Sequence, residues 1–367
     1  MSGEAIVIGG GPAGSVAALL LARGGWRVTV VEQHRFPRDK VCGECLSHLG
    51  AAVLDRLGLL DDVLSLGAVR LDRTLLHAPS GVSVDVALPR PMWGVSRAAL
   101  DGLLLDAAAG AGTHLLRPAR CESLEPGRRP AVHVRDLVTN TVDRLDADVV
   151  LVADGKAALF NDGPPPPTGD LGIKTHFENV DGPRDAIELF GLDGCYGGLA
   201  PIEGARWNAA LSVPAARVRQ HGGDLACLFA ELVEENDALR RRLAGARQAG
   251  PWLASPLPRF AVCRDWPPGV VPIGNAAAAI EPIGGEGMGL AMRSAEIAVE
   301  RLRAGPCGGD DDGPGLRGAY RRLWRPRSLA CRGAGRLASS RRCANMVAPL
   351  LRAAPGALRP VLSLLEK

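Results

Sequence analysis

The feature that most constrains this chain is a glycine-rich turn between two short apolar stretches near its start. Ala5–Ile8 has the pattern of a buried strand, and Gly9-x-Gly11-x-x-Gly14 follows it directly. A helical run and a second strand at Arg27–Val31 complete the unit. In such a unit the first glycine allows a tight turn, the second lets backbone amides approach a pyrophosphate, and the third lets helix and strand pack closely. The sequence therefore predicts the opening of a dinucleotide-binding fold.

An acidic residue at the end of the second strand supports this prediction. Glu32 stands 18 residues after Gly14, close to the spacing of about 20 in known dinucleotide-binding units. Its carboxylate can accept hydrogen bonds from an adenosine ribose, and its charge disfavours a 2′-phosphate. A glycine-rich turn without a ligand is the alternative, and the strand–turn–helix context argues against it.

Composition limits the possible classes of protein. The chain has 367 residues, 47% of them hydrophobic, which is enough for about two domains. Nine scattered cysteines indicate reduced thiols rather than a disulfide framework. With no cationic leader and no apolar run of membrane-spanning length, we expect a cytoplasmic protein. Only 4% of residues are aromatic, which argues against a nucleic-acid partner.

The remaining chain alternates between helical and strand-like patterns. We expect helices at 45–66, 98–111, 223–245 and 287–302. We expect a hairpin at 72–88 and strands at 146–152, within 171–213, at 257–263 and at 270–274. A proline run at 164–167 is typical of a linker, and the glycine-rich segment 307–315 of a flexible break.

Three spaced blocks carry a resemblance to a known family. They are the opening motif, Asp148-x-x-x-x-x-Asp154-Gly155, and Ile273-Gly-Asn-Ala-Ala277 with Pro282-x-Gly-Gly-Glu-Gly287. Their order and spacing resemble the FAD-dependent superfamily of aromatic hydroxylases, flavin halogenases and geranylgeranyl reductases. Phe36-Pro-Arg-Asp-Lys-Val-Cys42-Gly43-Glu44 resembles the geranylgeranyl reductase-like branch, in which a Cys-Gly segment runs beside the isoalloxazine.

The resemblance implies the fold class and the cofactor. It implies an α/β protein with a Rossmann-like FAD-binding domain of the glutathione reductase type, formed by residues 1–71, 97–168 and 262–304. An inserted antiparallel-sheet substrate domain would comprise residues 72–96 and 169–261, and a basic helical C-terminal region residues 316–367. FAD is the implied cofactor. The chain has no second Gly-x-Gly-x-x-Gly, so NAD(P)H is expected only as a transient reductant.

The resemblance also assigns the site residues. The FAD-binding set is Gly9, Gly11, Pro12, Ala13, Gly14, Glu32, Gln33, Lys40, Cys42, Gly43, Arg97, Asp154, Gly155, Gly274, Asn275, Pro282, Gly285, Gly287 and Met288. The flavin itself would carry the chemistry, with Cys42, Gly43 and Glu286 as candidates beside its ring. Glu286 has a second interpretation, because acids are favoured near helix N-termini.

Two departures from the family pattern bear on function. Asn275 stands where the family usually has Asp, so its bond to a ribityl hydroxyl would be uncharged. The reductases' Tyr-x-Trp-x-Phe-Pro signature appears as Tyr196-Gly-Gly-Leu-Ala-Pro201. The Trp-rich signature of halogenases is absent, and no lysine between Lys40 and Lys156 can serve as their catalytic amine, so a halogenase is disfavoured.

Cysteine and histidine spacing leave further interpretations. Cys42 and Cys45 have the spacing of a redox dithiol, although the family comparison needs only the Cys-Gly pair. The seven histidines lack metal-ligand spacing, so no metal is assigned. His77 and His176 can reach a substrate cavity, but core or surface placement is the preferred interpretation for each.

We expect an FAD-dependent, NAD(P)H-linked oxidoreductase acting on a small apolar organic substrate. Monooxygenation through a flavin hydroperoxide is the first choice. Double-bond reduction of an isoprenoid-like chain and flavin binding without turnover are the alternatives. Between Gly313 and Lys367 the chain has eleven arginines and a single acid, Glu366. This tail is predicted to form amphipathic helices that cover the substrate cavity, with weak contact to a membrane surface as the second interpretation.

Overall fold

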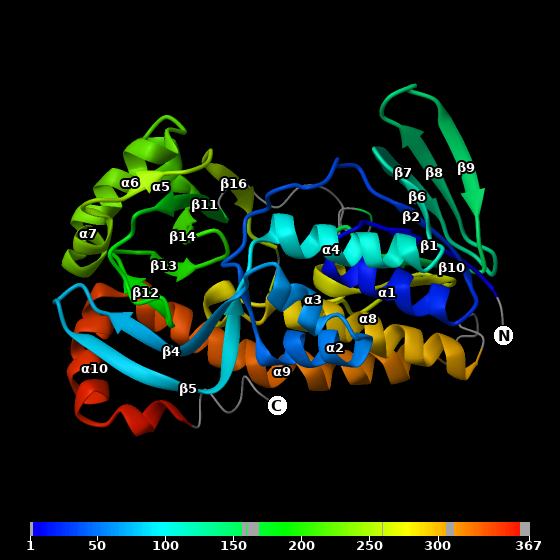
Figure 1. The fold of residues 1–367 in the computed structure, drawn as a ribbon. Helices are drawn as coiled ribbons and strands as arrows, with labels where there is room; N and C mark the ends of the chain where they lie inside the picture. The colour runs from blue at the N-terminus through cyan, green and yellow to red at the C-terminus, as the bar shows by residue number, and fades with distance from the viewer. Residues whose placement is uncertain (1–2, 156–158, 160–168, 259, 306–311, 360–367) are drawn as a thin grey trace.

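The computed structural model describes residues 3–155, 159, 169–258, 260–305 and 312–359. A five-stranded parallel sheet forms one half of the molecule (Figure 1). Its strands, in the order β17–β10–β1–β2–β6, are β17 (Val270–Pro272), β10 (Val149–Val152), β1 (Glu4–Ile8), β2 (Arg27–Val31) and β6 (His114–Leu116). Parallel strands are buried on both faces, which explains why they appear in the sequence as short continuous apolar runs.

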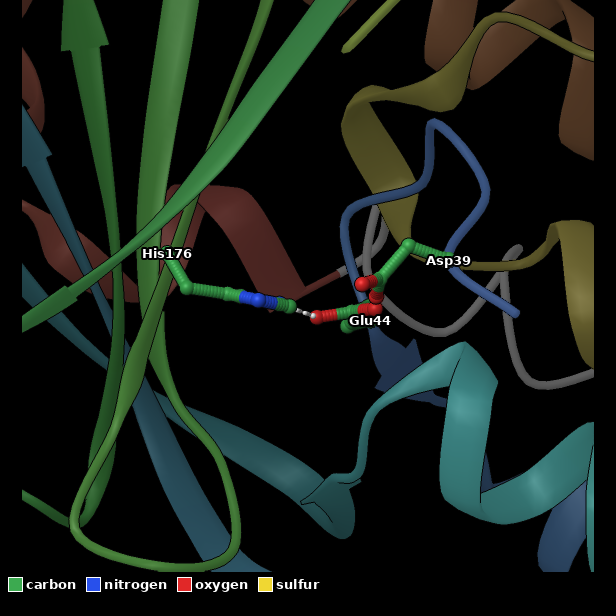
Figure 2. A group of neighbouring side chains, drawn as sticks. All are labelled: Asp39, Glu44 and His176. Atoms are coloured by element: carbon green, nitrogen blue, oxygen red, sulfur yellow. Dashed lines mark hydrogen bonds and ion pairs between the residues drawn. The ribbon is translucent and has the colours of Figure 1, made fainter. Parts of the chain in front are cut away.

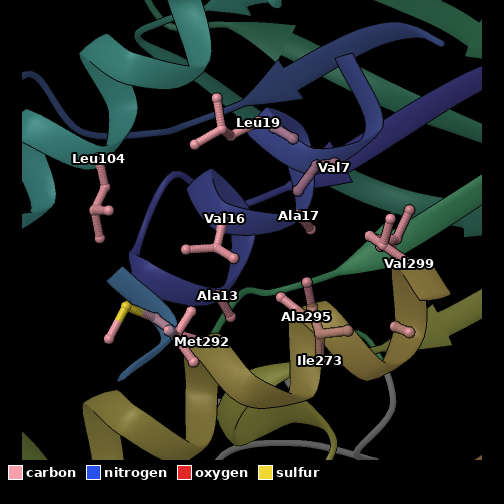
Figure 3. Close-up of a cluster of buried hydrophobic side chains, with 14 of the residues drawn as sticks. Val7, Ala13, Val16, Ala17, Leu19, Leu104, Ile273, Met292, Ala295 and Val299 are labelled. Atoms are coloured by element: carbon pink, nitrogen blue, oxygen red, sulfur yellow. The ribbon is translucent and has the colours of Figure 1, made fainter. Parts of the chain in front are cut away.

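Helices cover one face of this sheet and a small sheet covers the other. The helices are α1 (Pro12–Arg23), α4 (Arg97–Gly110) and α8 (Gly287–Ala304), and Figure 3 shows Val16 of α1 close to Met292 and Ala295 of α8. The opposite face packs on β7 (Ala119–Glu125), β8 (Ala131–Asp136) and β9 (Val142–Asp146). Alternate residues of β1 divide between the two cores, with Val7 on the helical side and Ile6 on the other.

A nine-stranded sheet forms the second half. Its order is β15–β11–β14–β13–β12–β4–β5–β3, and β16 also pairs with β11. The strands are β3 (Cys45–Leu46), β4 (Val69–His77), β5 (Ser83–Gly94), β11 (Asp170–Glu178), β12 (Ala186–Gly191), β13 (Tyr196–Pro201), β14 (Trp207–Pro214), β15 (Arg247–Gln248) and β16 (Leu253–Pro256). All its pairs are antiparallel except β12 with β4. Its outer face packs on α6 (Leu225–Glu234) and α7 (Asp237–Leu243), which follow α5 (Ala215–Gln220).

Two C-terminal helices connect the halves. α9 (Asp312–Ser339) runs beneath both halves in Figure 1, in contact with α8 at one end and with β12 and β13 at the other. α10 (Arg341–Ala353) then turns to pack on β5, at the end of the β4–β5 hairpin in Figure 1. Ser340 separates the two helices and caps α10 by accepting a hydrogen bond from the backbone N–H of Cys343.

The predicted fold class is confirmed, while several element boundaries are wrong. The helix expected at 45–66 is β3 followed by α2 (His48–Leu57) and α3 (Leu60–Ser65), because the left-handed Gly58 ends α2. The strand expected at 257–263 lies earlier, in β16. Helix α9 begins inside the expected break at 307–315. The proline run at 164–167 lies outside the described residues.

Candidate functional site

The three glycines of the opening turn have different structural roles. Gly9 has a φ of +103°, and a Cβ there would lie 2.5 Å from the carbonyl oxygen of Ala153. A Cβ on Gly14 would lie 1.9 Å from the Gly9 carbonyl oxygen. A Cβ on Gly11, the N-cap of α1, would meet nothing closer than 3.7 Å. Gly9 and Gly14 are therefore required by the fold, whereas Gly11 leaves open the space that a pyrophosphate would fill.

The first turn of α1 faces this space. Pro12 and Ala13 are its first two residues and both are buried. Pro at this position is compatible with a helix start because its missing N–H would have no intrahelical partner. The remaining N–H groups and the positive end of the helix dipole are suited to an anion.

Glu32 lies where a ribose-binding acid is expected. Its buried carboxylate accepts hydrogen bonds from the backbone N–H of Gly10 at 2.7 Å and of His34 at 2.7 Å. These bonds fix the carboxylate beside the glycine-rich turn. The next residue, Gln33, is exposed.

A cationic cluster lies beside Gly11. The guanidinium of Arg97, the first residue of α4, bonds Asp101 through both oxygens, and Arg38 lies 3.5 Å from the same carboxylate. Burial, together with the neighbouring Arg97 and Arg38, lowers the pKa of Lys40 to about 8. Three cations against the carboxylates of Asp101 and Glu32 leave a net positive charge, which suits the negative charge of a pyrophosphate diester.

Arg38 gives a second observation that fits a bound anion. Its Nε is buried and has no hydrogen-bond partner among the described residues. The nearest atoms to a Cβ on Gly11 would be Nη2 of Arg97 and Nη2 of Arg38, at 3.7 and 3.8 Å. The open space at Gly11 is therefore bounded by both guanidinium groups, so the residues present fit the diphosphate of FAD.

The other expected FAD residues gather at the same edge of the parallel sheet. Asp154 and Gly155 follow β10, which lies beside β1, and Gly274 and Asn275 follow β17, which lies beside β10. Both pairs therefore lie at the carboxyl ends of strands in the parallel sheet. Open α/β sheets bind their ligands at this edge. Asn275 is exposed, while the N–H of Gly274 donates to Ser294 Oγ at 2.8 Å.

The start of α8 completes the site. Pro282 opens a short 3-10 turn, Gly285 is left-handed with a φ of +67°, and α8 begins at Gly287. Met288 is buried in the core between α8 and α1. Glu286 is the residue just before the helix, as its second interpretation expects, but its side chain makes no capping hydrogen bond. It forms a buried ion pair with Arg327 of α9 at 3.7 Å.

The Cys42–Cys45 loop is held in place by the carboxylate of Glu44. This fully buried residue has a φ of +56°. Its carboxylate accepts hydrogen bonds from the ammonium of Lys174 and, at 2.9 Å, from the backbone N–H of Arg97. The imidazole Nε2 of His176 lies 2.7 Å from this carboxylate. Figure 2 shows the two side chains pointing toward each other. Burial alone would raise the pKa of Glu44, but bonding to His176 and the charge of Lys174 hold it below its ordinary value.

Sequence reasoning missed this network. Lys174 and His176 are two residues apart on β11, so their side chains point to the same face of the sheet. Two basic residues at that spacing on a buried strand are the signal in the sequence that indicates an acidic partner, since buried charges are paired. Asp39, Glu44 and His176 also bring three possible metal-ligand atoms within 4.8 Å of one another. Lys174 already neutralises charge in this cluster, which favours an ion-pair network over a metal centre.

The two thiols of the loop lie in different environments. Cys45 is buried, its thiol donates to the Gly43 carbonyl at 3.4 Å, and burial raises its pKa well above the ordinary value. Cys42 is half-buried, and its carbonyl accepts a hydrogen bond from the side chain of Asn208 at 3.0 Å. A thiol such as Cys45 is a poor nucleophile, which disfavours a redox dithiol.

A cavity of about 340 Å³ extends from this loop into the second half of the molecule. One end is lined by Cys42, Gly43 and Gly285, and the other by Ala344 and Leu351 of the C-terminal region. Between them the walls are mostly apolar strand residues of the nine-stranded sheet. Such a volume and lining suit an apolar ligand with few polar groups.

One hydrogen-bonded pair stands out in the cavity wall. The hydroxyl of Tyr196 lines the cavity and donates to the carboxylate of Glu281 at 2.6 Å. Burial raises the pKa of Tyr196 above its usual range and also raises the pKa of the half-buried Glu281. His77 lines the cavity at the end formed by the C-terminal region. Its Nδ1 lies 2.8 Å from the Ser83 hydroxyl, and its Nε2 lies 2.8 Å from the Glu188 carboxylate. His176 is in the Glu44 network, so both histidines are buried and hydrogen-bonded.

Comparisons with known proteins agree with this geometry. The family described as "FAD binding domain" matches residues 3–161. A menaquinone reductase of Mycolicibacterium smegmatis is 30% identical over 339 residues, covering 82% of this chain and 76% of the relative. A digeranylgeranylglycerophospholipid reductase of Methanopyrus kandleri is 26% identical over 319 residues, with the same coverage of 82% and 76%.

A solved structure shows the same fold. The flavin-dependent brominase Bmp2 superposes with a TM-score of 0.80 at 18% identity, covering 100% of this chain and 93% of that one. The glycine-rich turn, the cationic cluster and the extent of the match to the menaquinone reductase lead to one conclusion. The chain belongs to the family of FAD-dependent oxidoreductases that includes this reductase, and it is an FAD-dependent oxidoreductase.

Proposed function

We propose that the protein reduces carbon–carbon double bonds in an isoprenoid-like lipid, with NAD(P)H as the transient reductant of its FAD. The observation that carries this proposal is the long apolar cavity that leads from the predicted flavin-binding segments at Cys42 and Gly285 to the C-terminal helices. A cavity with a mostly apolar lining suits a hydrocarbon chain. Menaquinone and digeranylgeranylglycerophospholipid, the lipids in the names of two relatives, both carry chains of isoprene units.

Reduction of a double bond adds a hydride to one carbon and a proton to the other. When bound, FAD supplies the hydride. The protein must exclude water, hold the chain and deliver the proton. In the resting protein the Tyr196 hydroxyl donates to Glu281. In the relay Glu281 first takes up a proton from solvent and the hydrogen bond reverses. Glu281 then protonates the Tyr196 oxygen as that hydroxyl gives its own proton to the substrate carbon. The raised pKa of the Glu281 carboxyl favours this relay, because it keeps a fraction of the group protonated nearer neutral pH.

Monooxygenation, the first choice from sequence, would use the same cavity. We place double-bond reduction first because two relatives that align over four fifths of this chain are named as reductases. Flavin binding without turnover, the other alternative, gives no reason for a proton-relay pair in the wall of an apolar cavity.

The test uses protein loaded with FAD, NADH or NADPH, and menaquinone dispersed in detergent. Reduction predicts a product that gains two hydrogen atoms per double bond without oxygen consumption. A product that gains an oxygen atom, with matching oxygen uptake, would instead establish monooxygenation. Bound flavin that NAD(P)H plus substrate cannot bleach would support flavin binding alone.

Tyr196→Phe tests the proton relay. Loss of a general acid slows turnover by about 10²–10⁴-fold, while reduction of bound flavin by NAD(P)H should be unchanged. Tyr320→Phe is the matched control, because Tyr320 is also buried but its hydroxyl donates to the Pro272 carbonyl at 2.9 Å, away from the cavity lining. Equal turnover by the two variants would remove Tyr196 from the mechanism.

A further inference from the structure

Helix α10 separates the cavity from the surface of the molecule. Its inner face is built of Ala344, Val347, Ala348 and Leu351, which line the cavity. Its outer face carries Met346 and Leu350, whose positions one helical turn apart place them side by side. At α10, a helix with apolar residues on both sides therefore lies between the cavity and the outside.

The outer face of α10 exposes more apolar surface than a solvated helix needs. Met346 is 67% exposed and Leu350 is 66% exposed. Leu329 of the preceding helix is 68% exposed. Single exposed apolar residues are common, but two neighbours on one helix that also borders a substrate cavity call for an explanation.

The C-terminal segment itself carries charge of one sign. Arg341, Arg342 and Arg352 are exposed at the two ends of α10. From Gly313 to Arg359 the sequence contains eleven arginines and no acid. Exposed apolar side chains flanked by arginines are the pattern of a helix that lies in the interface of an anionic bilayer, with its long axis parallel to the surface.

The length of α10 agrees with an interfacial position. Its 13 residues span about 20 Å, which is too short to cross a bilayer core of about 30 Å. Within the described part of the chain, no helix has the length and hydropathy needed to span a membrane. Nucleic acid is a weaker match, because phosphates do not require Met346 and Leu350 to be exposed.

We infer that α10 docks flat on an anionic lipid bilayer, inserting Met346 and Leu350 among the acyl chains while the arginines contact the lipid head groups. Docking of this face would place the α10 wall of the cavity against the bilayer, so that a lipid chain could pass into the cavity without crossing water. The docking stands on α10 alone. The entry of substrate rests on the proposed function.

The experiment is co-sedimentation of the full, FAD-loaded chain with vesicles. We expect binding to phosphatidylcholine vesicles that contain phosphatidylglycerol, much weaker binding to pure phosphatidylcholine, and weakening by salt. Met346→Gln with Leu350→Gln should reduce partitioning at least about tenfold. Val138→Gln is the matched control, because Val138 is also 66% exposed but follows β8 at the opposite end of the molecule (Figure 1).

Four results would overturn the inference. The first is no binding to anionic vesicles, and the second is equal binding by wild type and the α10 double variant. The third is sedimentation velocity showing that wild type self-associates while the double variant is a monomer, since the face would then join two copies. Preferential binding of a duplex oligonucleotide that displaces vesicles would also count against it. Because docking is measured without turnover, a failure of the proposed reaction leaves this result unaffected.

Discussion

Replacing Glu44 with glutamine should destabilise the protein more than the loss of an ordinary ion pair would. The side chain of Lys174 is only 1% exposed, and its remaining carboxylate neighbour, Asp39, lies 3.5 Å away and is itself partly solvated. Removing one partner of a buried ion pair costs about 3–5 kcal/mol, because the other charge remains buried. Asp39 compensates in part, so we expect Glu44→Gln to lower the free energy of unfolding by about 3 kcal/mol.

Urea unfolding of the FAD-free protein measures this loss. Glu178 lies on β11 like Lys174, and it forms a more exposed ion pair with Arg247 of β15. Glu178→Gln should therefore lower the free energy of unfolding by under about 1 kcal/mol. Lys174→Met combined with Glu44→Gln should restore at least half of the loss, because no unpaired charge remains. If Glu44→Gln costs under about 1 kcal/mol, or if the double variant is no more stable than Glu44→Gln alone, the carboxylate does not hold the loop as described.

The same carboxylate predicts a pH dependence. The pKa of Glu44 is lower in the folded chain than its ordinary value of 4.5. Its stabilising contribution is therefore complete above pH 4.5 and is lost as the pH falls below 4.5 toward the folded pKa. Stability of Glu44→Gln should fall less steeply than that of wild type in this acid range. Parallel acid profiles for the two proteins would contradict the assignment.

Three further predictions concern the cofactor site. Gly11→Val should abolish FAD binding while lowering the unfolding free energy of the FAD-free protein by under about 1 kcal/mol. Gly14→Ala should instead destabilise the fold itself, since its Cβ would lie 1.9 Å from a carbonyl oxygen. A Gly11→Val protein with full flavin occupancy would refute the assignment. Cys45→Ser should leave turnover nearly intact, and Cys42→Ser should change the rate or the substrate preference while FAD stays bound. Loss of activity in both variants, with a two-thiol difference between oxidised and reduced enzyme, would establish a dithiol relay. Asn275→Asp should bind FAD as tightly as wild type or up to about 1 kcal/mol more tightly by fluorescence titration, and a large loss would mean that Asn275 acts as a donor.

The FAD-binding half was predictable because its determinants are local in sequence. Gly9, Gly11, Gly14 and Glu32 lie within one strand–helix–strand unit, where turn chemistry and strand pattern agree. The position of Asp154 and Asn275 at one edge of the sheet was also predictable, because the carboxyl ends of neighbouring parallel strands meet at that edge.

The missed features depend on contacts between distant segments. Glu44 meets Lys174 across 130 residues, and no local pattern encodes that pairing. The short strand β3 was read as helix because Cys45 and Leu46 precede a helical pattern, and only pairing with Gly94 and Trp93 of β5 makes them a strand. Tertiary pairing thus overrode local propensity at the loop on which the site depends.

The path of α9 has a thermodynamic consequence. Its first half joins the FAD-binding half through Tyr320, and its middle does so through the Arg327–Glu286 pair. At its end the Ser339 carbonyl accepts a hydrogen bond from the N–H of Gly194 in the second half at 3.0 Å. A helix bonded to both halves opposes a hinge motion between them, so opening or melting of one half disturbs the other. The binding free energy of a ligand in one half therefore stabilises both halves. Cofactor loading should raise the melting temperature of the whole molecule, which should unfold in one transition.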